Sequence, residues 1–472
     1  MQQMLDNIII ATNDFLWSKI LIILLVVCGL YFTIRSRFVQ FGMFKEMFAV
    51  LKGSNERSPD SISSFQAFCI SMAARVGTGN ITGIAIAIAI GGPGAIFWMW
   101  VIAIIGSASS FVESTLAQVY KIKDKTGFRG GPAYYMEQGL NKRWMGAIFA
   151  VLITLSFGLV FNAVQSNTIS IAFENSFGTN RVVVGLVMAA AFGIVIFGGI
   201  KRIARMSEYI VVVMAVIYIG AAFCIVLLNL EKMPDVITLI VKNAFGFEQI
   251  AGGSFGAVIL QGVKRGLFSN EAGMGSAPNA AATATTSHPV KQGLMQALGV
   301  LVDTLLICSS TAFIILLSDA YKQPELDGIL LTQAALSEHI GSWASGALAI
   351  MVFLFAFSTL IGNYYYGETN IEFLNSKKSV LRLYRYSVLA MVVFGAVAKV
   401  QLVWNLADLF MGLMVIVNLI AIVLLSKVAF AALHDYKQQK RAGKDPIFYK
   451  DSIKGVENVE CWDNSPEVKS KL

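Results

Sequence analysis

The sequence predicts an all-α protein that crosses a membrane many times. Of its 472 residues, 56% are hydrophobic and only 14% are charged, and the mean hydropathy is +0.67. A soluble domain carries about 25% charged residues. Long apolar segments recur along the whole chain, and two of them are interrupted near their centres. These observations indicate a polytopic membrane protein with an unusual site inside the bilayer.

Each membrane-spanning helix needs about 20 mostly apolar residues. The sequence offers eleven such segments, a leader followed by ten core spans. We expect the leader at 16–34 and core spans one to ten at 65–91, 95–120, 145–172, 181–200, 206–229, 253–283, 291–318, 344–370, 381–399 and 403–432. Between spans seven and eight, "DGILLTQAALSEHI" has helical spacing but is too short and polar to span. It predicts an amphipathic helix outside the membrane.

The positions of Lys and Arg predict the orientation. They gather in 35–57, 121–143, 201–205, 377–385 and 437–444, whereas the alternate loops are poor in them. Cytoplasmic loops carry such an excess, so we expect the N-terminus outside and the C-terminus in the cytoplasm. The net charge of +8 then reflects these loops and not a nucleic-acid partner. We expect the polar tail from about 434 to be flexible.

Two core spans are broken at corresponding positions. Core span one contains Gly77-Thr78-Gly79-Asn80, and the apolar run of core span six stops at Phe268, before "SNEAGMGS". Core spans one and six are the first spans of two halves, each made of five spans. Because five is an odd number, the second half enters the membrane from the opposite side, and the two halves have inverted topology. Such paired interruptions point to a transporter's binding site. We expect a leader region 1–64, repeats at 65–229 and 230–433, and a tail at 434–472.

Breaking a helix inside the bilayer costs free energy, because backbone groups lose their partners, and we expect such a break only where it lines a binding cavity. A helix end leaves about four unpaired N–H or C=O groups, and each costs several kcal/mol in hydrocarbon. The exposed ends carry roughly half a charge of either sign. A zwitterionic amino acid and a small cation suit such a cavity, and Thr78, Asn80, Ser269 and Asn270 offer side-chain hydrogen bonds. The alternative interpretation is that the glycines only allow close helix packing.

Four longer motifs resemble a known family. "GTGNITGIAIAIAIGGPGAIFWMW", "FVESTLAQVYK", "FRGGPAYYMEQGL" and "RGLFSNEAGMGSAP" are similar to signatures of the alanine or glycine:cation symporters, the sodium:alanine symporter family. The resemblance covers nearly the whole chain. It implies the leucine-transporter fold, an inverted repeat of five plus five spans behind an extra N-terminal span. It also implies sodium-driven import of alanine or glycine across a bacterial or archaeal cell membrane.

The resemblance also implies which residues form the sites. In this family the unwound part of core span one holds the substrate carboxylate, while span six and a Gln of span three face the substrate. The matching residues are Thr78, Gly79, Asn80, Gln165, Phe268, Ser269 and Gly273. The fold's cation site joins span-one carbonyls to span-eight hydroxyls, here Ala73 and Val76 with Ser358 and Thr359. These hard oxygen ligands suit a co-transported sodium ion.

One position departs from the family pattern. Relatives often have a Gly-Trp pair shortly before "YYGE" in core span eight, where this chain has Gly362 and Asn363. Asn is smaller than Trp and both donates and accepts hydrogen bonds. We therefore expect Asn363 to line the substrate site, so that glutamine or asparagine becomes an alternative substrate. The other interpretation is that Asn363 faces a neighbouring helix.

Charged residues within the spans have several interpretations. Arg75 lies just before the break, and a mid-membrane Arg costs about 2.5–3.5 kcal/mol unless paired. We expect a structural or gating pair, with Glu271, Asp303 or Glu368 as the partner. Four further charges are expected to be packed or interface-facing: Glu113, Lys264, Arg265 and Asp408.

Other classes of protein fit poorly. "GGSFG" at 252–256 matches the hydrolase pattern G-x-S-x-G, but it opens a membrane span and not the strand-turn-helix elbow that the motif needs, so the sequence does not predict an enzyme. "GTGNITG" is not G-x-G-x-x-G and the chain has no P-loop, so ATP-driven transport is not predicted either. A passive channel needs a continuous polar lining, whereas the polar groups here cluster at mid-span. Proton coupling is a closer alternative, but none of the four residues expected at the cation site is acidic.

Overall fold

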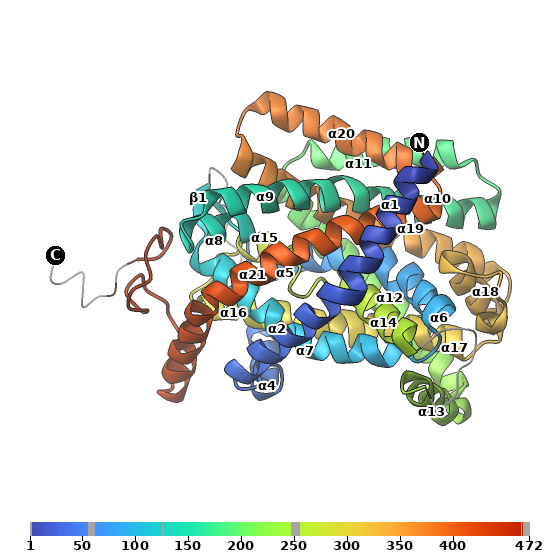
Figure 1. Ribbon diagram of the computed structural model, residues 1–472, viewed down its shortest axis with the longest axis horizontal. Coiled ribbons are helices and arrows are strands. Elements are labelled where there is room, and N and C mark those ends of the chain that lie inside the picture. The colour runs from blue at the N-terminus through green and yellow to red at the C-terminus, as the bar shows by residue number, and fades with distance from the viewer. Residues whose placement is uncertain (1, 55–61, 125–126, 247–254, 464, 466–472) are drawn as a thin grey trace.

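The computed structural model describes residues 2–54, 62–124, 127–246, 255–463 and 465. Most of its long helices run along the long axis of the molecule (Figure 1). Within the described residues the only sheet is a hairpin of β1 (Ile122–Asp124) and β2 (Gly127–Arg129). Eight described helices are long and apolar enough to cross a membrane, or nine if one bent pair is a single span. The all-α, multi-spanning architecture predicted above is confirmed.

The first part of the chain begins with a continuous helix made of α1, the π-helical segment η1 and α2. Its elements are α1 (Gln2–Phe15), η1 (Leu16–Leu21), α2 (Ile22–Arg35), α3 (Val39–Gly42), α4 (Phe44–Lys52), α5 (Ser64–Arg75), η2 (Gly79–Gly83), α6 (Ile84–Gly91), α7 (Ala95–Val119), α8 (Pro132–Gln138), α9 (Arg143–Ile153), η3 (Thr154–Phe161), α10 (Asn162–Phe177), α11 (Arg181–Ile196) and α12 (Ile200–Leu228). The bent pair consists of Ser64–Arg75 and Gly79–Gly91, which meet at 48°.

The second part contains the other interrupted span. Its elements are η4 (Leu230–Lys232), α13 (Met233–Ala244), α14 (Phe255–Asn270), α15 (Ala277–Ala281), α16 (Pro289–Leu301), η5 (Val302–Cys308), α17 (Ser309–Leu316), η6 (Ala320–Lys322), α18 (Gly328–Ile340), α19 (Trp343–Leu374), α20 (Lys378–Val397) and α21 (Val400–Arg441). Helix α18 forms where a short helix was expected, but only its Glu338 is exposed, so it is packed on most sides instead of amphipathic. Its place outside the membrane stays a prediction.

The number of eleven spans stays a prediction. The expected span 181–200 is the 16-residue helix α11. The expected span 253–283 is α14, a loop and α15, and its first two residues lie outside the described part of the chain. Helix α13 was not expected. Its Pro234 lies in the first turn with Asp235, and Lys242 lies in the last turn, a charge order that complements the helix dipole.

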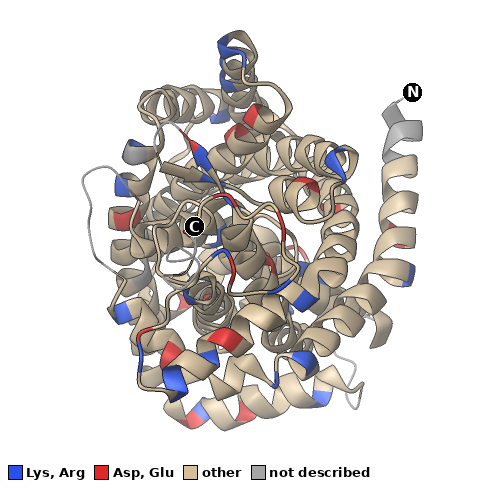
Figure 2. Ribbon diagram, turned by 90° about the vertical axis from the view of Figure 1, so that its left-hand side faces the viewer, with Lys and Arg blue, Asp and Glu red and all other residues tan. Residues whose placement is uncertain are grey.

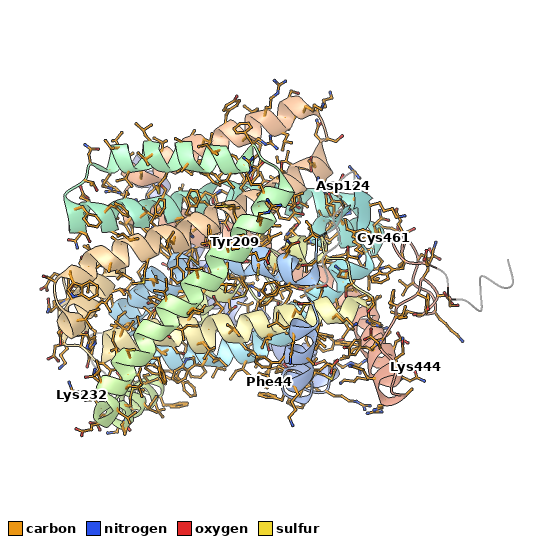
Figure 3. All side chains as sticks on the ribbon, turned by 180° about the vertical axis from the view of Figure 1, so that it is seen from behind. Phe44, Asp124, Tyr209, Lys232, Lys444 and Cys461 are labelled. Carbon is orange, nitrogen blue, oxygen red and sulfur yellow. The ribbon has the colours of Figure 1, made fainter. Side chains whose placement is uncertain are left out.

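The prediction of a flexible tail is wrong for its described part. Phe448 and Val459 are buried. The Phe448 N–H donates to the Ser287 carbonyl at 2.9 Å, and the Trp462 indole donates to the Gln118 carbonyl at 3.1 Å. A few apolar and aromatic side chains therefore fix a mainly polar segment to the helix ends. In Figure 3 the labelled Lys444, Cys461 and Asp124 lie at one end of the molecule, and Lys232 lies at the other.

The outer surface suits a bilayer. On α12, Val216 and Leu228 are 69% and 78% exposed, and exposed apolar side chains of this kind mark contact with lipid or another apolar partner. Seen from the end that carries the tail, charged residues gather toward the helix ends and loops (Figure 2). The start of α1 and the end of α21 lie toward opposite ends of the long axis (Figure 1). Which end faces the cytoplasm stays a prediction.

Candidate functional site

The first break interrupts a helix that begins with a strong signal. Ser63 caps α5 and forms a capping box with Gln66, which satisfies two backbone donors at the helix start. The helix ends at Arg75, and Val76 leaves the helical region with φ −78° and ψ 89°. Every residue from 76 to 83 is buried. The freed backbone groups therefore need partners within the protein.

Side chains from three helices supply those partners. The Gly77 N–H donates to Asn80 Oδ1 at 2.9 Å, and the Thr78 N–H donates to Gln165 Oε1 at 3.1 Å. The Thr311 hydroxyl donates to the Asn80 carbonyl at 2.6 Å. Gln165, which the family resemblance implies as a substrate contact, thus reaches the break from α10.

Beside this break, Thr359 of α19 lies against two span-one carbonyls. Its hydroxyl is 2.9 Å from the Ala73 oxygen and 3.2 Å from the Val76 oxygen. A Cβ added to Gly77 would lie 2.3 Å from Thr359 Oγ1, so only glycine permits this approach. Ser358 is placed differently, because its hydroxyl donates to the Phe355 carbonyl at 2.7 Å within its own helix.

This set of oxygens fits the chemistry of sodium. Unwound backbone carbonyls are the groups that coordinate sodium in transporters with broken helices, and hard cations take oxygen ligands. The Ala73 and Val76 carbonyls with the Thr359 hydroxyl meet that description. Ser358 is adjacent in the sequence, but no hydrogen bond joins it to Ala73 or Val76 among the described residues.

The second break follows Asn270, where α14 ends. Glu271, Gly273 and Gly275 have φ of 57°, 77° and 86°, a region that glycine adopts without strain. The carboxylate of Glu113 on α7 accepts the Gly273 N–H at 3.1 Å and the Gly275 N–H at 3.0 Å. Asn418 of α21 donates to the same carboxylate at 2.8 Å. Glu113 therefore holds the unwound backbone in place of a helical turn.

The two breaks touch each other. A Cβ on Gly79 would lie 3.0 Å from the Phe268 ring and 3.2 Å from the Ser269 Cα. Asp303 of η5 links the two, because Asn80 Nδ2 donates to its Oδ1 at 2.6 Å and the Ser269 hydroxyl donates to its Oδ2 at 2.8 Å. Four of the predicted substrate residues, Gly79, Asn80, Phe268 and Ser269, therefore form one buried cluster. Gly273 lies instead beside Ser109, Leu419 and Glu113.

Aromatic rings form one side of this cluster. Phe268 lies between Phe161 and Trp404, with both pairs of ring centroids 4.7 Å apart. The Arg265 guanidinium lies 4.9 Å from the Trp404 ring centroid and pairs with Asp408 at 2.6 Å. Arg265 and Asp408 are thus an internal ion pair, as expected of packed charges.

Asn363 lies four residues beyond Thr359 on α19, about one turn away. It is fully buried, and neither Nδ2 nor Oδ1 has a hydrogen-bond partner among the described residues. The buried Thr78 hydroxyl also has none within that part of the chain. Buried polar groups are normally hydrogen-bonded, so these unpaired atoms are unusual within the described part of the chain.

Arg75 does not pair with a carboxylate in the described structure. Its guanidinium donates to the Gln296 carbonyl and to the Ser110 hydroxyl, both at 3.3 Å. Of the three partners considered from the sequence, Glu368 pairs instead with Arg385 at 2.9 Å. Asp303 bonds Asn80 and Ser269, and Glu271 accepts the Ser276 hydroxyl. Arg75 is therefore a structural tie between helices.

Sequence reasoning missed two contributors to the site. From the sequence, Glu113 is expected to be a packed charge, and Asp303 is expected only as a possible partner of Arg75. Acidic residues inside apolar spans are functional candidates by default, and that signal was present at both positions. The fold also places Asn418 and Thr311 at the site, and no local sequence pattern marks either residue.

Comparison with known proteins identifies the family. Residues 1–450 match the model of the sodium:alanine symporter family. The chain belongs to this family. It is 72% identical to a Bacillus subtilis protein named "Probable sodium/glutamine symporter GlnT", over 98% of this chain and 97% of that protein. It is 55% identical to the "Amino-acid carrier protein AlsT" of the same organism, over 99% of this chain and all of the relative. The chain is thus an amino-acid symporter and not an enzyme, and it is a multi-pass protein of the cell membrane.

A more distant likeness concerns the fold alone. A manganese transporter from Eremococcus coleocola superposes with a TM-score of 0.51 at 15% identity, covering 83% of this chain and 85% of the other. The two chains therefore share a related transporter architecture. Its manganese says nothing about the ion of the present protein.

Proposed function

We propose that this symporter imports glutamine and other neutral amino acids together with sodium by alternating access. The unwound segments would hold the amino acid through Thr78, Gly79, Asn80, Gln165, Phe268, Ser269, Gly273 and Asn363. The positive end of a helix dipole favours its carboxylate. Repeats at 65–229 and 230–433 would move around this site, with the N-terminus outside and the C-terminus inside.

The observation that carries the glutamine assignment is the buried amide of Asn363. An amide buried without partners costs about 1–3 kcal/mol by mutational data. A substrate carboxamide would satisfy both of its atoms, because it offers a donor and an acceptor. Asn363 lies on the same helix as Thr359, so it belongs to the neighbourhood of the first break. The name of the relative at 72% identity supports the same substrate class.

Sodium would bind between the Ala73 and Val76 carbonyls and the hydroxyls of Ser358 and Thr359. There it would hold the end of α5 against α19 and so order the segment that contacts the substrate. One charge moving through 100 mV releases about 2.3 kcal/mol. At about 1.4 kcal/mol per tenfold, the membrane potential alone would support roughly 40-fold accumulation.

Three alternatives remain distinct from this proposal. Alanine or glycine is the main rival substrate, since other relatives are named as alanine carriers. Proton coupling is the rival energy source, since those names also include protons. A passive channel is the remote alternative, because the described polar groups gather at two breaks instead of along a pore.

Competition for uptake tests the substrate assignment. In proteoliposomes, unlabelled glutamine should suppress labelled alanine uptake at lower concentration than unlabelled glycine does. Asn363→Trp restores the residue often found in relatives and should abolish glutamine transport while keeping alanine transport. Equal loss of both substrates, or an unchanged preference, would assign Asn363 to helix packing and leave alanine or glycine as the substrate.

A further inference from the structure

The segments that lead from the two breaks to one end of the molecule meet there. Helix α5 runs to the first break, and α15 follows the second break. At their far ends the Thr285 N–H donates to the Ile62 carbonyl at 3.0 Å, and the Ser64 hydroxyl donates to the Thr285 carbonyl at 3.1 Å. We call residues 62–64 and 284–285 the joint. In the orientation proposed above the joint faces the cytoplasm, and alternating access requires it to separate.

The first part of the tail lies against the chain that follows the joint. The Phe448 N–H donates to the Ser287 carbonyl at 2.9 Å, and the Ser287 hydroxyl donates to the Pro446 carbonyl at 3.0 Å. Lys291 pairs with Asp445 at 2.9 Å. The Phe448 side chain is only 3% exposed. This part of the tail is therefore fixed to the start of α16.

The later part of the tail is anchored to two other helices. The Trp462 indole donates to the Gln118 carbonyl near the end of α7 at 3.1 Å, and Asn458 donates to the Gln138 carbonyl at the end of α8 at 3.0 Å. The rings of Phe448 and Trp462 meet edge to face, with their centroids 5.1 Å apart. The tail therefore crosses from α16 to α7 and α8.

Lys121 connects this tail to the joint. It is 2% exposed, and its ammonium donates to the Ala284 carbonyl at 3.0 Å and to Gln118 Oε1 at 2.8 Å. The ring centroids of Trp462 and Phe128 lie 4.8 Å and 4.0 Å from its Nζ. An ammonium is attracted to an aromatic face, and a hydrogen bond is stronger where water is excluded. Trp462 therefore stabilises a contact made to the joint itself.

We propose that residues 445–462 form a strap that holds the joint closed and slows the release of substrate at this end. The contact of Trp462 with Lys121 fastens the strap. This inference rests on the alternating access proposed above, because that mechanism requires the joint to open. The strap contacts neither set of proposed site residues, so it changes how fast the joint opens. The final accumulation ratio, which the ion gradient determines, stays the same.

Thiol labelling measures the opening of the joint without any transport. Ile62→Cys places a thiol at a buried position of the joint, in a parent chain whose two cysteines outside the buried class are removed by Cys224→Ser and Cys461→Ser. Trp462→Ala should speed labelling of this thiol roughly tenfold, since one hydrogen bond and one ammonium–ring contact are lost. Phe448→Ala removes the ring that Trp462 packs against and should act the same way. It decides the question alone if Trp462→Ala does not fold. Labelling at the parent rate overturns the proposal.

An exposed tryptophan provides the matched control. Trp144 of α9 is 63% exposed, and Trp144→Ala should label at the parent rate. Faster labelling there contradicts a specific role for the strap. In proteoliposomes, Trp462→Ala should raise the initial rate of sodium-driven glutamine uptake and keep the final accumulation ratio. A rate that does not rise, or a lower final ratio, overturns the proposed slowing. Absence of sodium-driven uptake in the wild type refutes the proposed function instead, and the labelling rates still decide whether the strap closes the joint.

Discussion

Replacing Asn363 by leucine separates a substrate-binding amide from a packing residue. Leucine keeps the branched shape and removes two polar atoms that have no partner among the described residues. Two hydrogen bonds to a carboxamide at about 0.5–1.5 kcal/mol each predict a loss of about 1–3 kcal/mol in glutamine binding. This corresponds to a roughly 5- to 150-fold rise in the concentration for half-maximal uptake. Alanine uptake should change little, because alanine has no carboxamide.

The stability of the same variant provides an independent readout. Removing an unpaired buried amide relieves a cost of about 1–3 kcal/mol, so the purified Asn363→Leu protein should not melt earlier than wild type. Asn167→Leu is the matched control, since Asn167 donates to the Gly395 and Ala398 carbonyls, each at 2.8 Å. That variant should melt earlier and keep the substrate preference. If Asn363→Leu melts earlier and loses both substrates equally, the reasoning about Asn363 is refuted.

Three further outcomes follow from the described contacts. Thr359→Ala removes a hydroxyl that contacts two carbonyls, and it should raise the sodium concentration for half-maximal uptake roughly tenfold or more; an unchanged sodium curve would place the ion elsewhere. Gly77→Ala puts a Cβ 2.3 Å from that hydroxyl and should abolish uptake while a fluorescent fusion still reaches the membrane; retained uptake would contradict the close approach. Burial lowers the pKa of His288 below 6.5, partly opposed by Asp435, so the unfolded chain takes up a proton first as pH falls. Stability should therefore drop as pH falls below about 6.5, and His288→Asn should flatten the melting profile between pH 5 and 8; parallel profiles would contradict this.

The sequence predicted the breaks because their signal is local. Glycines and polar residues inside an apolar run mark a helix that cannot continue, and this holds at Gly77 and after Phe268 without knowledge of the fold. The contact of Thr359 with Ala73 followed from the family resemblance, and its geometry agrees with that expectation. It stays a prediction that the residues at the breaks bind the substrate and that Thr359 and Ala73 bind the ion.

The partners of the breaks were not predictable from local pattern. Glu113 lies 160 residues before the N–H group of Gly273 that it accepts, so only tertiary packing brings them together. Phe448 and Trp462 are two of the few aromatic residues in a mainly polar tail, and the average composition of the tail does not reveal that these side chains are buried against the helix ends. The contacts that hold the tail down are made by remote helix ends.

The central claim is that sodium drives amino-acid import. Its most direct test is the uptake of labelled glutamine into proteoliposomes of the purified wild-type protein under one imposed ion gradient at a time. An inward sodium gradient at equal pH should concentrate glutamine above its external level, and equal potassium or proton gradients without sodium should not. Concentration that needs only the proton gradient, or mere equilibration under every gradient, would contradict sodium symport.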